Sequence, residues 1–299
     1  MKIENLMPPS IPIRIKSGVD RYGFSRILAR RINLRYVPRS FANWVHGWVW
    51  CTDDMAVQIA CSDLPKDLSI VVNNEGDRLV LVAEGFLNVR CGGLPFAYVA
   101  KQHDFRHDDA LLVIPPHSSE PLLGKLTATQ EDYFDYIESI MKDFDYVYVS
   151  IHQLDINTPL HYAALSRGLK VIQGAAPSDA NGLIRVRTLL DGFKYVTSNV
   201  MGSHMLYALY AGCHFSFAGS FFSYPHSELI GTEKDTRQRY SRFFCQHPRR
   251  GLRDIEFAVK SIGEKYILQS HEIIDALGWS VAGQVSGYSK VFQRKWRGI

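Results

Sequence analysis

Residues 195–218, YVTSNVMGSHMLYALYAGCHFSFA, contain the pattern that decides the fold. A β-prone run, Tyr195–Ser198, leads through a small polar turn into a helical segment, Ser203–Tyr210, which stops at Gly212. A second β-prone run, His214–Ala218, follows at once. A strand, a helix and a strand in such close succession predict a βαβ unit with parallel strands.

The same alternation extends upstream to about residue 109. Helical segments that contain Tyr133–Met141, Pro159–Leu165 and Gly182–Leu190 separate further strand-like runs at Ala110–Ile114, Tyr146–Ile151 and Lys170–Ile172. Short connections of this kind form right-handed crossovers, so the sequence predicts a doubly wound sheet of five parallel strands.

The first third of the chain differs in residue composition and in its pattern of secondary structure. Leu34–Trp50 is rich in aromatic and β-prone residues. Ser69–Asn73 and Arg78–Glu84 resemble strands on either side of a turn at Asn74–Asp77. These short elements predict a second, smaller α/β unit.

The fold class expected is therefore α/β with two Rossmann-like domains. The smaller N-terminal domain would cover residues 1–106 and the larger domain residues 107–299. The boundary is placed in the polar stretch Lys101–Asp108.

Composition and charge exclude several classes of protein. The chain has 299 residues, of which 46% are hydrophobic and 21% charged, and these values are typical of a folded globular protein. Its net charge of +4 is too small to indicate nucleic-acid binding without a basic patch or a binding motif. No GxGxxG, GxxxxGK[ST] or GxSxG motif is present, which argues against a dehydrogenase, a P-loop enzyme and an α/β-hydrolase.

Cysteine usage and hydropathy predict a cytoplasmic protein. The five cysteines are scattered, odd in number and without CxxC pairs, so neither a disulfide framework nor a zinc site is expected. No apolar run approaches the ~20 residues of a membrane helix. The segment Lys290–Arg297 interleaves cations with aromatic residues, which fits either a solvated C-terminal helix or peripheral contact with a membrane.

The turn after Tyr195–Ser198 is the strongest candidate for binding an anion. Backbone N–H groups at a helix start favour phosphate, and small residues permit close approach. The residues proposed for this site are Ser198, Asn199, Gly202, Ser203 and His204. The alternative is that Ser203 only caps its own helix.

Other strand ends would meet at the same edge of the sheet, because the carboxyl ends of parallel strands face one way. A proline-stiffened loop after the first strand of the larger domain carries His117, Ser118 and Ser119. His152 and Gly174 follow the next two strands. We expect His117 to hold a phosphate oxygen or to carry a proton, and the others to line the donor site.

The smaller domain offers candidates for a general base. His46 lies in the stretch Trp44–Trp48, where aromatic rings beside an imidazole would suit a cleft that stacks on a sugar. The alternative is a core strand with one exposed histidine. Glu84 is the acidic candidate for the same role.

Three stretches resemble the GT-B glycosyltransferases of bacterial surface polysaccharide (capsule and lipopolysaccharide) biosynthesis. Leu111–Ser119 is similar to the strand and histidine loop of that family. Tyr195–Gly212, with the strand at His214–Gly219, resembles its donor-phosphate segment, and His46-Gly47-Trp48 resembles an acceptor-domain loop. The paired-glutamate spacing of retaining members is missing, which leaves the stereochemistry open.

The resemblance implies a glycosyltransferase without a cofactor, and because no DxD-like element follows a strand we expect it to be independent of a metal. Its donor would be a nucleotide-sugar and its acceptor a glycan or lipid-linked glycan, at the cytoplasmic side of the membrane. Three alternatives stay open: a nucleotide-sugar epimerase, a polyol-phosphate transferase, and a non-catalytic subunit that binds a nucleotide or a glycan.

Overall fold

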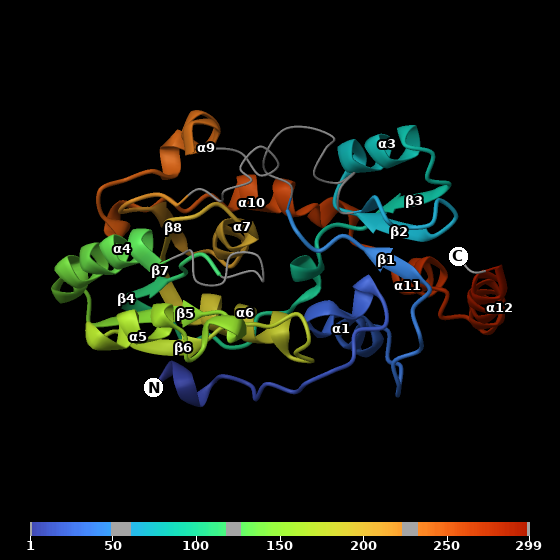
Figure 1. Ribbon diagram of the computed structural model, residues 1–299, viewed down its shortest axis with the longest axis horizontal. Helices are drawn as coiled ribbons and strands as arrows, with labels where there is room; N and C mark the ends of the chain where they lie inside the picture. The colour runs from blue at the N-terminus through green and yellow to red at the C-terminus, as the bar shows by residue number, and fades with distance from the viewer. Residues whose placement is uncertain (1, 49–60, 118–126, 223–232, 298–299) are drawn as a thin grey trace.

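The computed structural model describes residues 2–48, 61–117, 127–222 and 233–297. Two separate parallel sheets organise these residues, as Figure 1 shows. The smaller sheet consists of β1 (Ala42–Trp44), β2 (Ser69–Val72) and β3 (Asn88–Cys91). The larger sheet consists of β4 (His107–Val113), β5 (Tyr146–Ile151), β6 (Lys170–Gln173), β7 (Phe193–Ser198) and β8 (His214–Phe217).

The larger sheet has the strand order β6-β5-β4-β7-β8, with every neighbouring pair parallel. Its connecting helices are α4 (Thr127–Ile140), α5 (Pro159–Ser166), α6 (Gly182–Gly192) and α7 (Ser203–Tyr210). Leu111 and Val113 face a core built with α4 and α5, whereas Ala110 and Leu112 face a core that includes α6 and α7. Helices therefore cover both faces, which confirms the predicted doubly wound sheet.

The smaller sheet is also parallel, with order β1-β2-β3, and this confirms a second Rossmann-like α/β unit. One element differs from the prediction. Of the strand expected at 78–84, residues 78–83 instead belong to α3 (Glu75–Ala83), and Glu84 is its C-cap. The Asn74 side chain accepts a hydrogen bond from the Asp77 N–H, so this polar stretch caps a helix and does not form a hairpin turn.

The C-terminal helices return the chain to the smaller sheet. They follow α9 (Glu233–Tyr240) and comprise α10 (Ile255–Ile262), α11 (Ser270–Leu277) and α12 (Val281–Arg297). The Asn73 side chain donates to the Ser261 carbonyl, and the Ser69 hydroxyl donates to the Ala276 carbonyl. Residues beyond about 260 thus pack on the smaller unit, while the proposed division at 106/107 stays a prediction.

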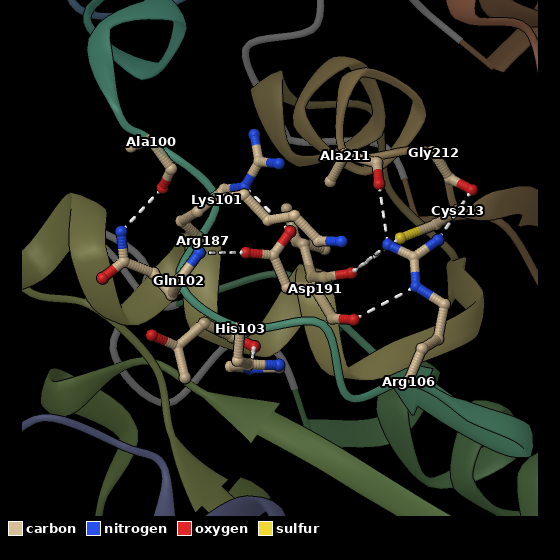
Figure 2. Close-up of polar contacts among 12 residues, drawn as sticks. Ala100, Lys101, Gln102, His103, Arg106, Arg187, Asp191, Ala211, Gly212 and Cys213 are labelled. Carbon is tan, nitrogen blue, oxygen red and sulfur yellow. Dashed lines mark hydrogen bonds and ion pairs between the residues drawn. The ribbon is translucent and has the colours of Figure 1, made fainter.

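The segment between the two sheets is anchored by Arg106, as Figure 2 shows. Its guanidinium donates to the carbonyls of Ala211 and Gly212 at 2.7 and 2.9 Å, and to the Asp191 carbonyl at 3.1 Å. These carbonyls lie at the C-terminal ends of α6 and α7, where the helix dipoles are negative. One cation therefore joins two helix ends to the connecting segment.

The buried Asp191 carboxylate forms the second half of this anchor. One oxygen accepts from the Gln102 N–H at 2.7 Å and the other from Arg187 at 2.9 Å.

None of the helices in the described part of the chain has the length and apolar character needed to cross a membrane.

Candidate functional site at the strand ends

The candidate site lies where the connections of two adjacent strands diverge. β4 and β7 are neighbours, and the Ile114 N–H donates to the Thr197 carbonyl at their carboxyl ends. The chain leaves β4 toward α4 on one face and leaves β7 toward α7 on the other. Such a switch point opens the crevice in which α/β sheets bind ligands.

The start of α7 lies at this switch point, after the carboxyl end of β7. Gly202 is its N-cap residue and has an extended backbone with φ −178°. The Met205 N–H bonds back to the Gly202 carbonyl, which begins the helix. The helix start carries the partial positive charge that favours an anion.

A loop of the smaller unit meets this helix start directly. The Trp48 N–H donates to the Ser203 hydroxyl at 2.9 Å, and the Tyr207 hydroxyl donates to the His46 carbonyl at 3.2 Å. These partners are 155 and 161 residues apart in the sequence. The structure thus joins two segments, His46–Trp48 and Tyr195–His204, that the sequence singled out separately.

His46 presents a neutral imidazole with one unused nitrogen. Its Nε2–H donates to the Gly18 carbonyl, and burial lowers its pKa to about 4, with a smaller contribution from the positive charge of Arg21. Nδ1 is buried and has no hydrogen-bond partner in the described part of the chain. This nitrogen carries the lone pair of the ring and is an unused hydrogen-bond acceptor.

Three histidines from separate strand ends approach one another. The rings of His117 and His152 are 4.9 Å apart between centroids. Burial and then the charge of His117 lower the pKa of His152. Burial lowers the pKa of His204 to about 4, its Nε2 lies 3.1 Å from the Val200 carbonyl, and His117 again contributes. His117, the exposed member, can donate a hydrogen bond to an anion above the strand ends.

Asn199 offers the other unused group at this edge. Its side chain is buried, and its amide Nδ2 donates to the Ser220 carbonyl at 3.1 Å. Its Oδ1 has no hydrogen-bond partner among the described residues. A buried acceptor without a partner is unfavourable, and a ligand donor can satisfy it.

Other predicted donor-site residues have structural roles. The Ser198 hydroxyl donates to the Ile114 carbonyl at 2.7 Å and accepts from the Val200 N–H, so both of its functions are used by the backbone. A Cβ at Gly174 would come within 2.9 Å of the Ser150 hydroxyl, and one at Gly202 within 2.7 Å of the His204 ring. The space beside Gly202 is thus occupied by His204. Ser118 and Ser119 lie outside the described residues.

The aromatic residues of the first loop belong to the core. Trp44 is fully buried and donates its indole N–H to the Gly93 carbonyl. The Trp48 ring lies 5.8 Å from both Tyr240 and Phe257. Neither indole is available to stack on a sugar, which corrects that part of the interpretation.

Glu84 is separated from the other candidates. It caps the C-terminal end of α3, which begins at the carboxyl edge of the smaller sheet and ends at the opposite edge, before β3. The residue is exposed there. The structure therefore does not bring Glu84 to His46.

Sequence reasoning missed the loop before α1 (Phe24–Arg31). Tyr22 has a left-handed backbone with φ 57°, which is uncommon for a tyrosine, and its N–H donates to the Pro177 carbonyl of the larger unit. Its ring lies 6.1 Å from the His46 ring. The neighbouring Arg21 is exposed and close enough to influence the pKa of His46. The flanking glycines, Gly18 and Gly23, are the feature of the sequence that could have indicated a turn here.

A cavity of about 390 Å³ lies elsewhere, at the amino ends of the smaller sheet. Ala42, Ser69 and Asn88, which begin the three strands, line it together with α12, and no predicted site residue does. In the described ranges no group of three or more His, Cys, Asp or Glu side chains is arranged to hold a metal ion.

Comparisons with known proteins add solved structures only, since no family model and no curated protein matches the chain. A TarM structure of S. aureus, in complex with UDP and a GlcNAc-glycerol, matches 90% of this chain and 54% of its own at 13% identity and a TM-score of 0.35. UDP-GlcNAc 2-epimerase of Methanocaldococcus jannaschii matches 71% and 62% at 12% identity and a TM-score of 0.38. S. aureus MnaA, solved with UDP, matches 89% and 80% at 13% identity and a TM-score of 0.36.

The chain spans little more than half the length of the TarM structures that it matches. Likeness at these TM-scores adds nothing to what the two parallel sheets already show. The assignment of a function must come from the site itself.

Proposed function

We propose that this chain is a glycosyltransferase that moves a sugar from a nucleotide-sugar donor to a glycan acceptor, in polysaccharide biosynthesis at the cytoplasmic side of the membrane. One observation carries the proposal. A neutral imidazole of the smaller unit, whose Nδ1 has no partner among the described residues, is held by hydrogen bonds of its own loop against the start of α7 in the larger unit. A base beside an anion-binding helix start is the pairing that transfer from a sugar phosphate needs.

The donor would bind at the strand ends of the larger unit. Its phosphate would lie against the backbone N–H groups at the start of α7 and accept a hydrogen bond from His117. Asn199 Oδ1 would accept a hydrogen bond from a donor hydroxyl or base N–H. Arg21 of the smaller unit would approach the same phosphates from the other side.

The acceptor hydroxyl would give its proton to His46 Nδ1. Because the Nε2–H donates to Gly18, the tautomer with a lone pair on Nδ1 is the one present. The low pKa keeps the ring neutral near pH 7, so the lone pair is available. Negative charge on the departing phosphate would favour the imidazolium that forms. Helix dipole and imidazoles would supply the charge stabilisation, without a divalent ion in the scheme.

The test measures nucleotide release and binding in parallel. The protein is titrated calorimetrically with UDP-, GDP-, CDP- and CMP-sugars, and release of nucleotide is then followed with and without a panel of oligosaccharide acceptors. His46→Gln is expected to lower kcat by about 10²- to 10⁴-fold while donor affinity changes by less than about threefold. His271→Gln, at an exposed position of α11, is the matched control and should retain full activity.

Each alternative has its own outcome. Interconversion of the donor sugar without an acceptor would replace the proposal with an epimerase, and transfer of a polyol together with its phosphate from an added CDP-polyol, with release of CMP, would replace it with a polyol-phosphate transferase. Absence of binding for every nucleotide would favour a non-catalytic subunit. Equal rates for wild type and His46→Gln would remove His46 as the base.

A further inference from the structure

The last helix carries an apolar stripe that is largely exposed in the described part of the chain. Five large apolar side chains recur along α12 at spacings of four and three residues, which places them on one side of the helix. Their exposures are high: Val281 85%, Val285 68%, Tyr288 53%, Phe292 69% and Trp296 85%. Figure 1 shows α12 at the outer end of the molecule, beyond the smaller sheet.

The opposite side of α12 is fixed to the protein. Gly287 lies against the Phe41 ring, where a Cβ would clash. Arg294 forms an ion pair with Asp67, and Lys290 lies 3.5 Å from the same carboxylate. The Gln284 side chain donates to the Arg39 carbonyl at 2.8 Å. The apolar stripe is therefore held facing outward.

The charge on this helix has one sign. The helix sequence contains no acidic residue and four basic ones, Lys290, Arg294, Lys295 and Arg297. The Arg39 guanidinium lies over the ring of Tyr288 at 5.5 Å, at the edge of the stripe. The loop that contains Arg39 also exposes Arg35, together with Tyr36, which is 73% exposed. Asp67 is engaged by two cations of α12, and Asp275, which lines the same cavity, pairs with Arg90.

We propose that α12 and the adjoining 35–39 loop form a surface that binds anionic lipid membranes, with α12 lying in the plane of the interface. Aliphatic and aromatic side chains would enter the region between headgroups and acyl chains, while Arg35 and Arg39 of the adjoining loop contact anionic headgroups. A second copy of this chain would bring the same positive charge to the contact, so the charge favours lipid over self-association. This proposal is independent of the enzymatic one.

Vesicle sedimentation tests the membrane surface. Wild-type protein should bind vesicles with about a third anionic phosphatidylglycerol at least about tenfold more tightly than vesicles of phosphatidylcholine alone, and added salt should weaken that binding. The combined variant Val285→Ser, Phe292→Ser and Trp296→Ser should reduce the affinity by at least about tenfold. A control with Leu79→Ser, Leu87→Ser and Tyr162→Ser, at comparably exposed positions elsewhere, should bind within about twofold of wild type.

Tryptophan fluorescence gives a second readout. Vesicles should shift the emission of wild type to shorter wavelength, and Trp296→Phe should lose most of that shift while it still binds. Equal affinity for both vesicle types, or unchanged binding by the combined variant, would overturn the proposal. A dimer that the combined variant dissociates, with no vesicle binding by wild type, would assign the stripe to a second copy.

Discussion

The Arg106 anchor and the strand-end crevice use buried polar groups in opposite ways. At the anchor, the guanidinium and both Asp191 oxygens have protein partners at 2.7–3.2 Å. At the crevice, His46 Nδ1 and Asn199 Oδ1 are buried and lack a partner in the described ranges. Because unpaired buried atoms are unfavourable, the first region is built for stability and the second is suited to binding.

Removing the acid of the anchor should have the largest effect on stability. Asp191→Ala would leave Arg187 buried without its charge partner and the Gln102 N–H without an acceptor. We expect a loss of about 3–5 kcal/mol in the free energy of unfolding, measured by urea denaturation. Asp104→Ala, which removes an exposed ion pair with Lys101, should leave the unfolding midpoint unchanged. A loss for Asp191→Ala no larger than for Asp104→Ala would contradict the stabilising role of the anchor.

Acid should destabilise the crevice through its buried imidazoles. His46 and His204 have a folded-state pKa of about 4, below the ordinary value of 6.5, so the unfolded chain takes up protons first as the pH falls. Stability that is complete above pH 6.5 should therefore be lost toward pH 4, by up to about 3 kcal/mol for each ring. Urea denaturation across this range should show a smaller loss for the double variant His46→Gln and His204→Gln. If wild type and the double variant lost stability identically as the pH falls, the two histidine rings would not be buried in their neutral form.

The smallest effect is expected at Asn199. Asn199→Ala removes one hydrogen bond, to the Ser220 carbonyl, and should lower the free energy of unfolding by about 1 kcal/mol. It should also weaken binding of the nucleotide-sugar measurably in calorimetry. Ser198→Ala, whose hydroxyl serves only the backbone, should reduce stability similarly while affinity stays within about twofold. If Ser198→Ala weakened binding of the nucleotide-sugar and Asn199→Ala did not, Ser198 would be the residue that contacts the ligand and Asn199 the structural one.

The larger sheet could be predicted because each strand contains a short apolar or β-prone run that ends at a turn signal. Tyr146–Ile151 matches β5 residue for residue, and Ser203–Tyr210 matches α7. The prediction was wrong at Arg78–Glu84, where alternating valines and leucines suggested a strand. The Asp77 N–H donates to the Asn74 side chain and caps a helix. The sequence does not show whether this capping bond or a hairpin turn is the more stable.

The candidate site was predictable in place more than in detail. Parallel strand ends gave the correct edge for His117, His152 and His204. The contact between Trp48 and Ser203 links two units across 155 residues, and no local pattern encodes such a pairing. For the same reason, only the folded chain shows that the Ser198 hydroxyl donates to the Ile114 carbonyl and that the Tyr22 ring lies near the His46 ring.

The two hydrogen bonds that hold the His46 loop on α7 give the fold a mechanical property. The proposed base and the proposed phosphate site belong to different units, so any hinge motion that parts the units also separates the reacting groups. Catalytic competence would then depend on how long the units stay closed, and the rate of reopening would set how quickly products leave.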